Sequence, residues 1–172
     1  MWPPSASHLH RLSLPPFSRA QGHGLSYTTF NYTAISLSPA PPISSLPGGG
    51  TFSGRGRQGY LDAVSTAVVT ATVSLCNTGA RSGTEVVQVY SQDPVGDWGG
   101  DVVIAPYWKR LVGFARVQLA AGACGSVSVP LLADDLAVYD DAMALRIQPG
   151  AYIISAGGRS DQDTAQAPLV LS

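Results

Sequence analysis

Residues 69–75 alternate strictly between apolar and polar side chains, in the order Val-Thr-Ala-Thr-Val-Ser-Leu. A period of two places the apolar side chains on one face of a β-strand and the hydroxyl groups on the other, so this strand is half buried. Residues 77–83 contain an asparagine and two glycines and predict a tight turn. In residues 84–91, which follow, the apolar side chains fall on both faces, as in a strand that is covered on two sides.

Further strands are predicted for residues 26–37, 108–119, 142–147 and 151–156. Gly113 indicates a bulge, and Pro130, in the alternating residues 126–131, indicates an edge strand or a strand end, because proline cannot donate to a ladder. Gln148-Pro149-Gly150 predicts the turn of a closing hairpin. No helical period competes with these signals. The chain is therefore predicted to be all-β, an antiparallel β-sandwich of about seven strands with very short helices or none.

Residues 39–59 hold ten glycines and prolines in a stretch of 21 residues. Such a composition is typical of linkers, and we expect a flexible insertion that packs no core. The whole chain has 172 residues, enough for one domain but too few for a catalytic barrel of about 250 residues.

The charge balance argues against a nucleic-acid partner. Ten basic residues stand against eleven acidic ones, with no basic run beyond Arg55 and Arg57, so little could neutralise a phosphate backbone. No stretch reaches the 18 consecutive apolar residues of a membrane helix, and we expect no membrane partner. Residues 1–20 lack the pattern of a secretory signal peptide.

Two features depend on the cellular compartment. Cys76 and Cys124 could form one disulfide, but their spacing matches neither a metal site nor a redox pair, and two buried thiols are expected. Asn31-Tyr32-Thr33 is an acceptor tripeptide for N-glycosylation, which is used only in a protein that passes through a secretory compartment.

Candidate chemistry is sparse. Asp97 lies beside Trp98 in a glycine-rich stretch, but a glycosidase needs a second carboxylate on a rigid element, and we expect a solvated loop. Trp98, with Tyr107 and Trp108, remains a possible sugar contact. The paired acids at 134–135 and 140–141 lack the pattern of a calcium loop and are interpreted as solvated turns. No catalytic residue, metal site or cofactor is predicted.

Four short motifs occur in order along the chain. They are Gly-His-Gly-Leu-Ser-Tyr-Thr-Thr-Phe at 22–30, Asn-Thr-Gly at 77–79 with Gly-Thr-Glu-Val-Val-Gln-Val-Tyr at 83–90, Pro106 with Lys-Arg-Leu-Val-Gly-Phe-Ala-Arg-Val at 109–117, and Pro-Gly-Ala-Tyr at 149–152 with Gly157. Together they resemble the C-terminal fibronectin type III-like (immunoglobulin-like) domain of glycoside hydrolase family 3, which contains β-glucosidases and β-xylosidases. The signature residues are Gly22, Gly24, Leu25, Ser26, Tyr27, Phe30, Asn77, Gly79, Glu85, Gln88, Tyr90, Gly113, Phe114, Gly150 and Tyr152.

The resemblance implies a non-catalytic accessory domain, because the family's two catalytic carboxylates belong to a barrel and a middle domain that have no counterpart here. The expected partners are those catalytic domains, with polysaccharide as a further possibility. The alternative is a freestanding carbohydrate- or protein-binding module. The residues do not decide between xylosidase and glucosidase parentage. The family suggests secretion, although this chain shows no signal peptide.

On this resemblance the chain is a detached or truncated terminal domain. Residues 1–20 form an unmatched, disordered leader, residues 21–38 the signature and first strand, residues 39–59 the insertion, and residues 60–172 the remaining sandwich. Leu25, Tyr27 and Phe30 are expected to anchor the lead-in strand on the sandwich.

Overall fold

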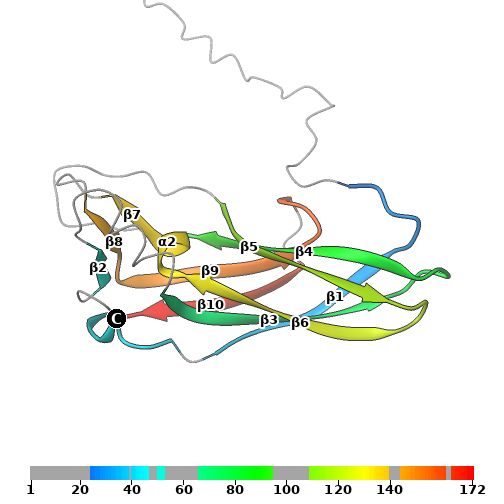
Figure 1. Ribbon diagram of the computed structural model, residues 1–172, viewed down its shortest axis with the longest axis horizontal. Helices are drawn as coiled ribbons and strands as arrows, with labels where there is room; N and C mark the ends of the chain where they lie inside the picture. The colour runs from blue at the N-terminus through cyan, green and yellow to red at the C-terminus, as the bar shows by residue number, and fades with distance from the viewer. Residues whose placement is uncertain are drawn as a thin grey trace, which may run out of the picture.

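The computed structural model describes residues 24–38, 40–46, 50–52, 66–94, 109–139, 144–161 and 164–172. Two antiparallel sheets pack against each other (Figure 1). The three-stranded sheet has the order β1 (Phe30–Leu37), β3 (Ala67–Asn77), β6 (Cys124–Leu132). The four-stranded sheet has the order β10 (Ala165–Leu171), β9 (Gly150–Gly157), β4 (Gly83–Gln92), β5 (Arg110–Leu119). The predicted fold, a β-sandwich of about seven strands, is confirmed.

A small third sheet lies at one end of the sandwich (Figure 1). It has the order β2 (Thr51–Phe52), β8 (Leu145–Ile147), β7 (Ala137–Tyr139). The predicted closing hairpin is wrong, because β8 pairs with β2 and β7 whereas β9 pairs with β4 and β10. Gly150 has a φ of 146°, a backbone conformation that residues with a side chain rarely adopt. Pro149 and Gly150 thus lead the chain from β8 of the small sheet into β9 of the four-stranded sheet.

The helical elements of the described residues are very short, as predicted. They are the 3-10 turn η1 (Ile43–Ser45) and the helix α2 (Ala133–Leu136). Pro130 lies in the edge strand β6, and the register of β4 with β5 shifts beside Gly113, which confirms both predictions. A Cβ at Gly113 would come within 2.6 Å of Val129, so the two sheets approach closely there.

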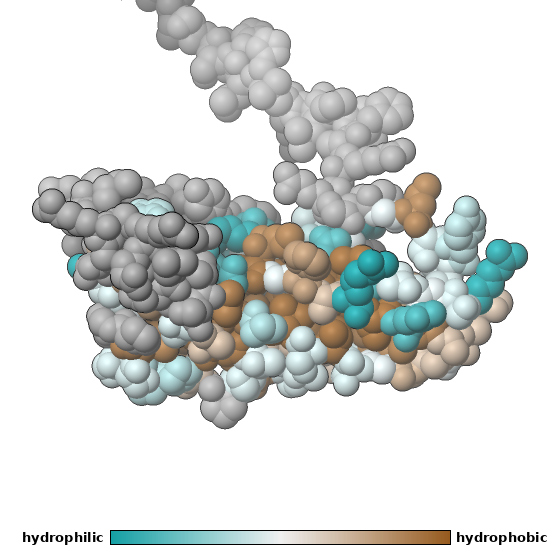
Figure 2. Space-filling model, in the orientation of Figure 1, coloured by the Kyte–Doolittle hydropathy of each residue, from teal (hydrophilic) through white to brown (hydrophobic). Residues whose placement is uncertain are grey.

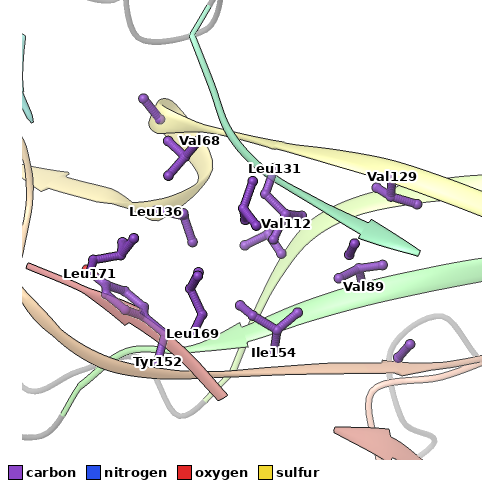
Figure 3. Packing of buried hydrophobic residues seen from close by; sticks show 14 of the residues in the cluster. Val68, Val89, Val112, Val129, Leu131, Leu136, Tyr152, Ile154, Leu169 and Leu171 are labelled. Atoms are coloured by element: carbon purple, nitrogen blue, oxygen red, sulfur yellow. The ribbon is translucent and has the colours of Figure 1, made fainter. Parts of the chain in front are cut away.

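The core lies between the inner faces of the two main sheets. In β3 the alternation works as predicted, since Val69, Ala71, Val73 and Leu75 are buried. Figure 3 shows Val89 and Ile154 of the four-stranded sheet pointing toward Val129 and Leu131 of the other. These contacts between branched side chains supply the apolar burial that holds the sheets together.

The insertion packs more of the core than expected. Ile43, Leu46 and Phe52 are buried members of the hydrophobic cluster, so the prediction that residues 39–59 pack no core is wrong for these side chains. The backbone N–H of Ile43 donates to the carbonyl of Ser172 at 2.8 Å. Composition describes the segment on average, whereas single apolar side chains between prolines can still reach the core.

Cys76 and Cys124 form a disulfide, so the expectation of buried thiols is wrong. The two residues lie opposite each other in the β3–β6 register. Cys76 also falls on the polar face of β3, in phase with Thr72 and Ser74, and Cys124 is exposed. The alternation of β3 places Cys76 on the outer face. The expectation of buried thiols relied instead on the general tendency of cysteine toward burial.

Candidate docking surface

The lead-in segment, residues 24–29, is held on the sandwich by Asn77. Only 1% of Asn77 is exposed, and its Oδ1 accepts hydrogen bonds from Thr28 Oγ1 at 2.6 Å and from the Gly79 N–H at 3.1 Å. Its Nδ2 donates to the carbonyls of Arg81 at 2.8 Å and Leu119 at 3.2 Å. The side chain thus joins the lead-in segment to the turn after β3 and to the end of β5, and every polar atom of the amide has a partner.

Two glycines let the lead-in segment lie this close. A Cβ at Gly79 would fall 2.1 Å from Thr28 Oγ1, and one at Gly83 would fall 2.6 Å from Thr28 Cγ2 and 3.3 Å from the Phe30 ring. A side chain at either position would push the lead-in segment away from the sheet. Thr28 was not predicted as the anchor, although it lies inside the first motif and its partner Asn77 opens the second.

Leu25 and Tyr27 do not anchor the strand. They are 93% and 94% exposed, so the expectation for these two side chains is wrong. Phe30 does pack against the hydrophobic cluster. The physical reason is that the buried hydrogen bond of Thr28 holds the segment, which leaves the apolar side chains before it directed away from the sandwich.

The outer face of β4 and β5 carries further exposed apolar side chains. Val86, Leu111 and Phe114 are exposed, and Phe114 leaves 65% of its surface in contact with solvent. Phe114 lies opposite Gln88 in the register, and Leu111 lies opposite Tyr90. Figure 2 shows hydrophobic side chains gathered near the middle of one face of the molecule, where β4 and β5 lie in Figure 1. We call Leu25, Tyr27, Val86, Leu111 and Phe114 the lead-in surface.

A cavity of about 390 Å³ connects the lead-in segment to this face. Its walls include Leu25 and Ser26 on one side, Glu85 and Val86 on the other, and Arg159 at the β9–β10 turn. The Tyr32 hydroxyl donates to Glu85 Oε1 at 2.9 Å. Burial raises the pKa of Glu85 above its ordinary value, an effect that the hydrogen bond from Tyr32 partly opposes, and burial also raises the pKa of Tyr32.

The remaining signature residues of β4 hold the β9–β10 turn. Gln88 Nε2 donates to the carbonyl of Gly158 at 2.8 Å, and the Tyr90 hydroxyl donates to Gln88 Oε1. Lys109 Nζ lies 4.6 Å from the centre of the Tyr90 ring and donates to the carbonyl of Ser160 at 2.7 Å. Gln88 and Tyr90 are therefore explained by the folding of this chain alone.

The last motif is structural as well. Tyr152 is almost fully buried, and its hydroxyl donates to the carbonyl of Gln148 at 2.8 Å. Burial raises the pKa of Tyr152 above its ordinary value. At Gly150 a Cβ would lie 2.8 Å from Pro94 Cβ. This contact, with the positive φ, explains the glycine.

Two acidic residues of the described part, Asp93 and Asp135, have structural partners. Asp93 Oδ1 pairs with Arg110 Nη2 at 3.0 Å. Asp135, placed in α2 rather than in a solvated turn, accepts a hydrogen bond from the backbone N–H of Leu132 at 3.0 Å. Among the residues that the structure describes, no three metal-binding side chains gather at one point. In the same residues no helix is long and apolar enough to cross a membrane.

Several predicted residues lie outside the described residues. They are Gly22 of the first motif, the paired acids at 140–141, Asp97, and the three aromatic residues proposed as a sugar contact, Trp98, Tyr107 and Trp108. The sugar contact therefore stays a prediction.

Comparison with known proteins agrees with the motifs. The family model of the fibronectin type III-like domain matches residues 85–160. The chain is 32% identical over 142 residues to the β-xylosidase of Formosa agariphila, covering 83% of this chain and 16% of that protein. It is 34% identical over 154 residues to the β-glucosidase cel3A of Pyricularia oryzae, covering 89% of this chain and 20% of that protein.

Solved structures give the same result. The β-D-glucoside glucohydrolase of Trichoderma reesei superimposes with a TM-score of 0.67 and 28% identity, covering 88% of this chain and 20% of that chain. The β-glucosidase of Chaetomella raphigera superimposes with a TM-score of 0.68 at the same identity. The chain thus spans a fifth or less of the length of these relatives.

Proposed function

Since this chain carries the fibronectin type III-like domain of the family 3 glycoside hydrolases, we propose that it is a non-catalytic accessory domain that packs against the catalytic part of such an enzyme. The contact is made through the lead-in surface. The parent activity is the hydrolysis of β-glucosides or β-xylosides, the substrates that the names of the relatives imply.

One observation carries this proposal. The signature residues Asn77, Gly79 and Gln88 make their contacts within this chain. The large apolar ones at 25, 27 and 114 instead leave most of their surface in solvent. Exposed apolar side chains grouped around one feature favour a contact with another protein surface.

The energy available is sufficient for docking. Full burial of an apolar side chain of this size contributes about 1.5–3 kcal/mol relative to exposure. Aromatic residues at the centre of an interface are often the positions where truncation has the largest effect. Leu25, Tyr27 and Phe114 are therefore the side chains whose burial would contribute most to a contact between two domains.

The acids of the described part also favour a non-catalytic role. Retaining glycosidases need two carboxyl groups about 5–5.5 Å apart at the scissile bond. Glu85 is instead bonded to Tyr32, Asp93 to Arg110, and Asp135 to the start of α2. We expect the purified chain to leave aryl β-xylosides and aryl β-glucosides intact, and turnover that is lost on replacing an acid of this chain would contradict the proposal.

The docking is tested in a chimera. In the β-xylosidase of Formosa agariphila, the segment that this chain matches is replaced by this chain, and unfolding is followed in urea. Phe114→Ser should lower the free energy of unfolding of the chimera by about 2 kcal/mol. In the isolated chain, the same variant should change the free energy of unfolding by no more than about 0.5 kcal/mol, because the side chain is exposed there.

Tyr139→Ser is the matched control. Tyr139 is also an exposed aromatic residue, but it lies in β7 of the small sheet, away from the lead-in surface. It should have a small effect in both proteins. Equal effects of Phe114→Ser and Tyr139→Ser in the chimera would overturn the assignment of the lead-in surface.

A further inference from the structure

The outer face of the three-stranded sheet differs from the lead-in surface in chemistry. Outward positions of β3 and β6 carry hydroxyl groups, and β1, β3 and β6 contain no charged residue. We call this the hydroxyl face, made by Thr70, Thr72, Ser74, Ser126 and Ser128. Thr72 Oγ1 and Ser128 Oγ lie 3.1 Å apart and share a hydrogen bond across the strands.

The acceptor tripeptide Asn31-Tyr32-Thr33 lies at the border of the hydroxyl face. Asn31 and Thr33 are exposed, while the Tyr32 side chain points into the core. Asn31 is opposite Cys76 in the register, so both lie on the outer face, and β1 is an edge strand. Its neighbours on this face are small, which leaves room for a bulky group on the Asn31 amide.

The disulfide beside Asn31 is an independent indication of the compartment. Disulfides persist in oxidising environments such as the endoplasmic reticulum and the cell exterior, and they are rare in reducing ones. Cys76, the register partner of Asn31, is bonded to Cys124. N-linked glycans are attached in the same secretory route in which such disulfides form. An accessible acceptor tripeptide and a disulfide therefore occur on one face of one domain.

We infer that Asn31 is an N-glycosylation site and that the chain is made in a secretory compartment. The donor is an oligosaccharide linked to a polyprenyl diphosphate. Asn31 Nδ2 forms a bond to the anomeric carbon, the bond from that carbon to the diphosphate breaks, and the amide proton is released as the lipid diphosphate leaves. No change of oxidation state is involved.

A glycan on Asn31, which goes beyond the accessory role, would also show which sheet faces away from the catalytic part. The glycan would stand on the three-stranded sheet, whereas Phe114 and Leu111 lie on the outer face of the four-stranded sheet. The sugar would therefore stand on the opposite sheet from Leu111 and Phe114 and leave these two side chains free for docking. The hydroxyl face would be the side that an assembled enzyme presents to water.

Expression of the whole chain behind a cleavable signal peptide in a eukaryotic secretory host tests this inference. The secreted protein should carry one glycan, because the sequence contains one acceptor tripeptide. Peptide N-glycanase should remove the mass increase and convert the Asn31 amide to a carboxylate, which peptide mass spectrometry detects. A secreted, disulfide-bonded chain with no sugar on Asn31 would overturn the inference.

Matched variants identify the site. Asn31→Gln and Thr33→Ala should abolish the mass increase, whereas Thr33→Ser should keep it because serine also serves in the acceptor tripeptide. If a variant is not secreted, translation with microsomes gives the same mass readout. Failure of glycosylation would leave the Phe114 result in the chimera unchanged, so the two proposals fail separately.

Discussion

The two outer faces of this sandwich follow the same strand periodicity but differ in their exposed apolar side chains. On the three-stranded sheet, the outward side chains are hydroxyls and a disulfide. On β4 and β5, they include Val86, Leu111 and Phe114, and the lead-in segment adds Leu25 and Tyr27. Alternation explains which side chains point outward, but it does not explain why one outer face carries large exposed apolar side chains. Under the proposed accessory role, the first face meets water and the second meets protein.

The largest expected effect on stability comes from the disulfide beside the hydroxyl face. Replacing both Cys76 and Cys124 by serine should lower the free energy of unfolding by about 4 kcal/mol, because the bond closes a loop with a sequence separation of 48 residues. Urea unfolding measures the change. Thr72→Ala on the same face is the control, with an expected change within about 0.5 kcal/mol. A double serine variant as stable as the parent would show that the disulfide does not stabilise the folded chain.

Asn77→Ala tests the element that presents the lead-in surface. It leaves the carbonyls of Arg81 and Leu119 and the Thr28 hydroxyl without their buried partner, and we expect a loss of about 3 kcal/mol. Thr29→Ala removes only an exposed hydroxyl pair with Thr78 and should change stability by less than about 1 kcal/mol. The account of the anchor fails if the two variants have equal unfolding midpoints in urea.

Glu85→Gln tests how the stability of the region beside the lead-in segment depends on pH. The pKa of Glu85 is raised in the folded chain, so the folded state favours the protonated form. The stability that this form provides is complete below the ordinary value of 4.5 and is lost as the pH rises through the raised value. Glutamine keeps an acceptor for Tyr32 without the charge.

The melting temperature measured from pH 4 to pH 7 should therefore fall less in Glu85→Gln than in the parent chain. Asp93 and Asp135, whose pKa values are also raised by burial, still contribute to the fall in both proteins. If the melting temperatures of the parent and the variant fell equally with pH, Glu85 would not contribute to the pH dependence of stability.

The sequence predicted the architecture because strand periodicity is a local property. The alternation at residues 69–75 and the proline at 130 identified a half-buried strand and an edge strand without any knowledge of partners. The hairpin at 148–150 failed for the opposite reason. Two neighbouring strands can join different sheets, and that choice depends on contacts with distant residues, such as those of β8 with β2.

The candidate site was predictable only in part. The motifs identified the residues, but the expectation that Leu25 and Tyr27 anchor the lead-in strand assumed that large apolar side chains are buried. The anchor is instead Thr28, which needs the distant Asn77 and the space above Gly79. A signal was present in the first two motifs, but the contact spans 49 residues and no local pattern shows it.

The central claim, that the lead-in surface is covered in an assembled enzyme, is tested most directly by footprinting tyrosines with hydroxyl radicals. Tyr27 is 94% exposed in this chain, and Tyr139 is an exposed tyrosine of the small sheet. The account predicts that Tyr27 reacts readily in the isolated chain and is protected in the chimera with the catalytic part, while Tyr139 reacts similarly in both. Equal labelling of Tyr27 in the two proteins would contradict it.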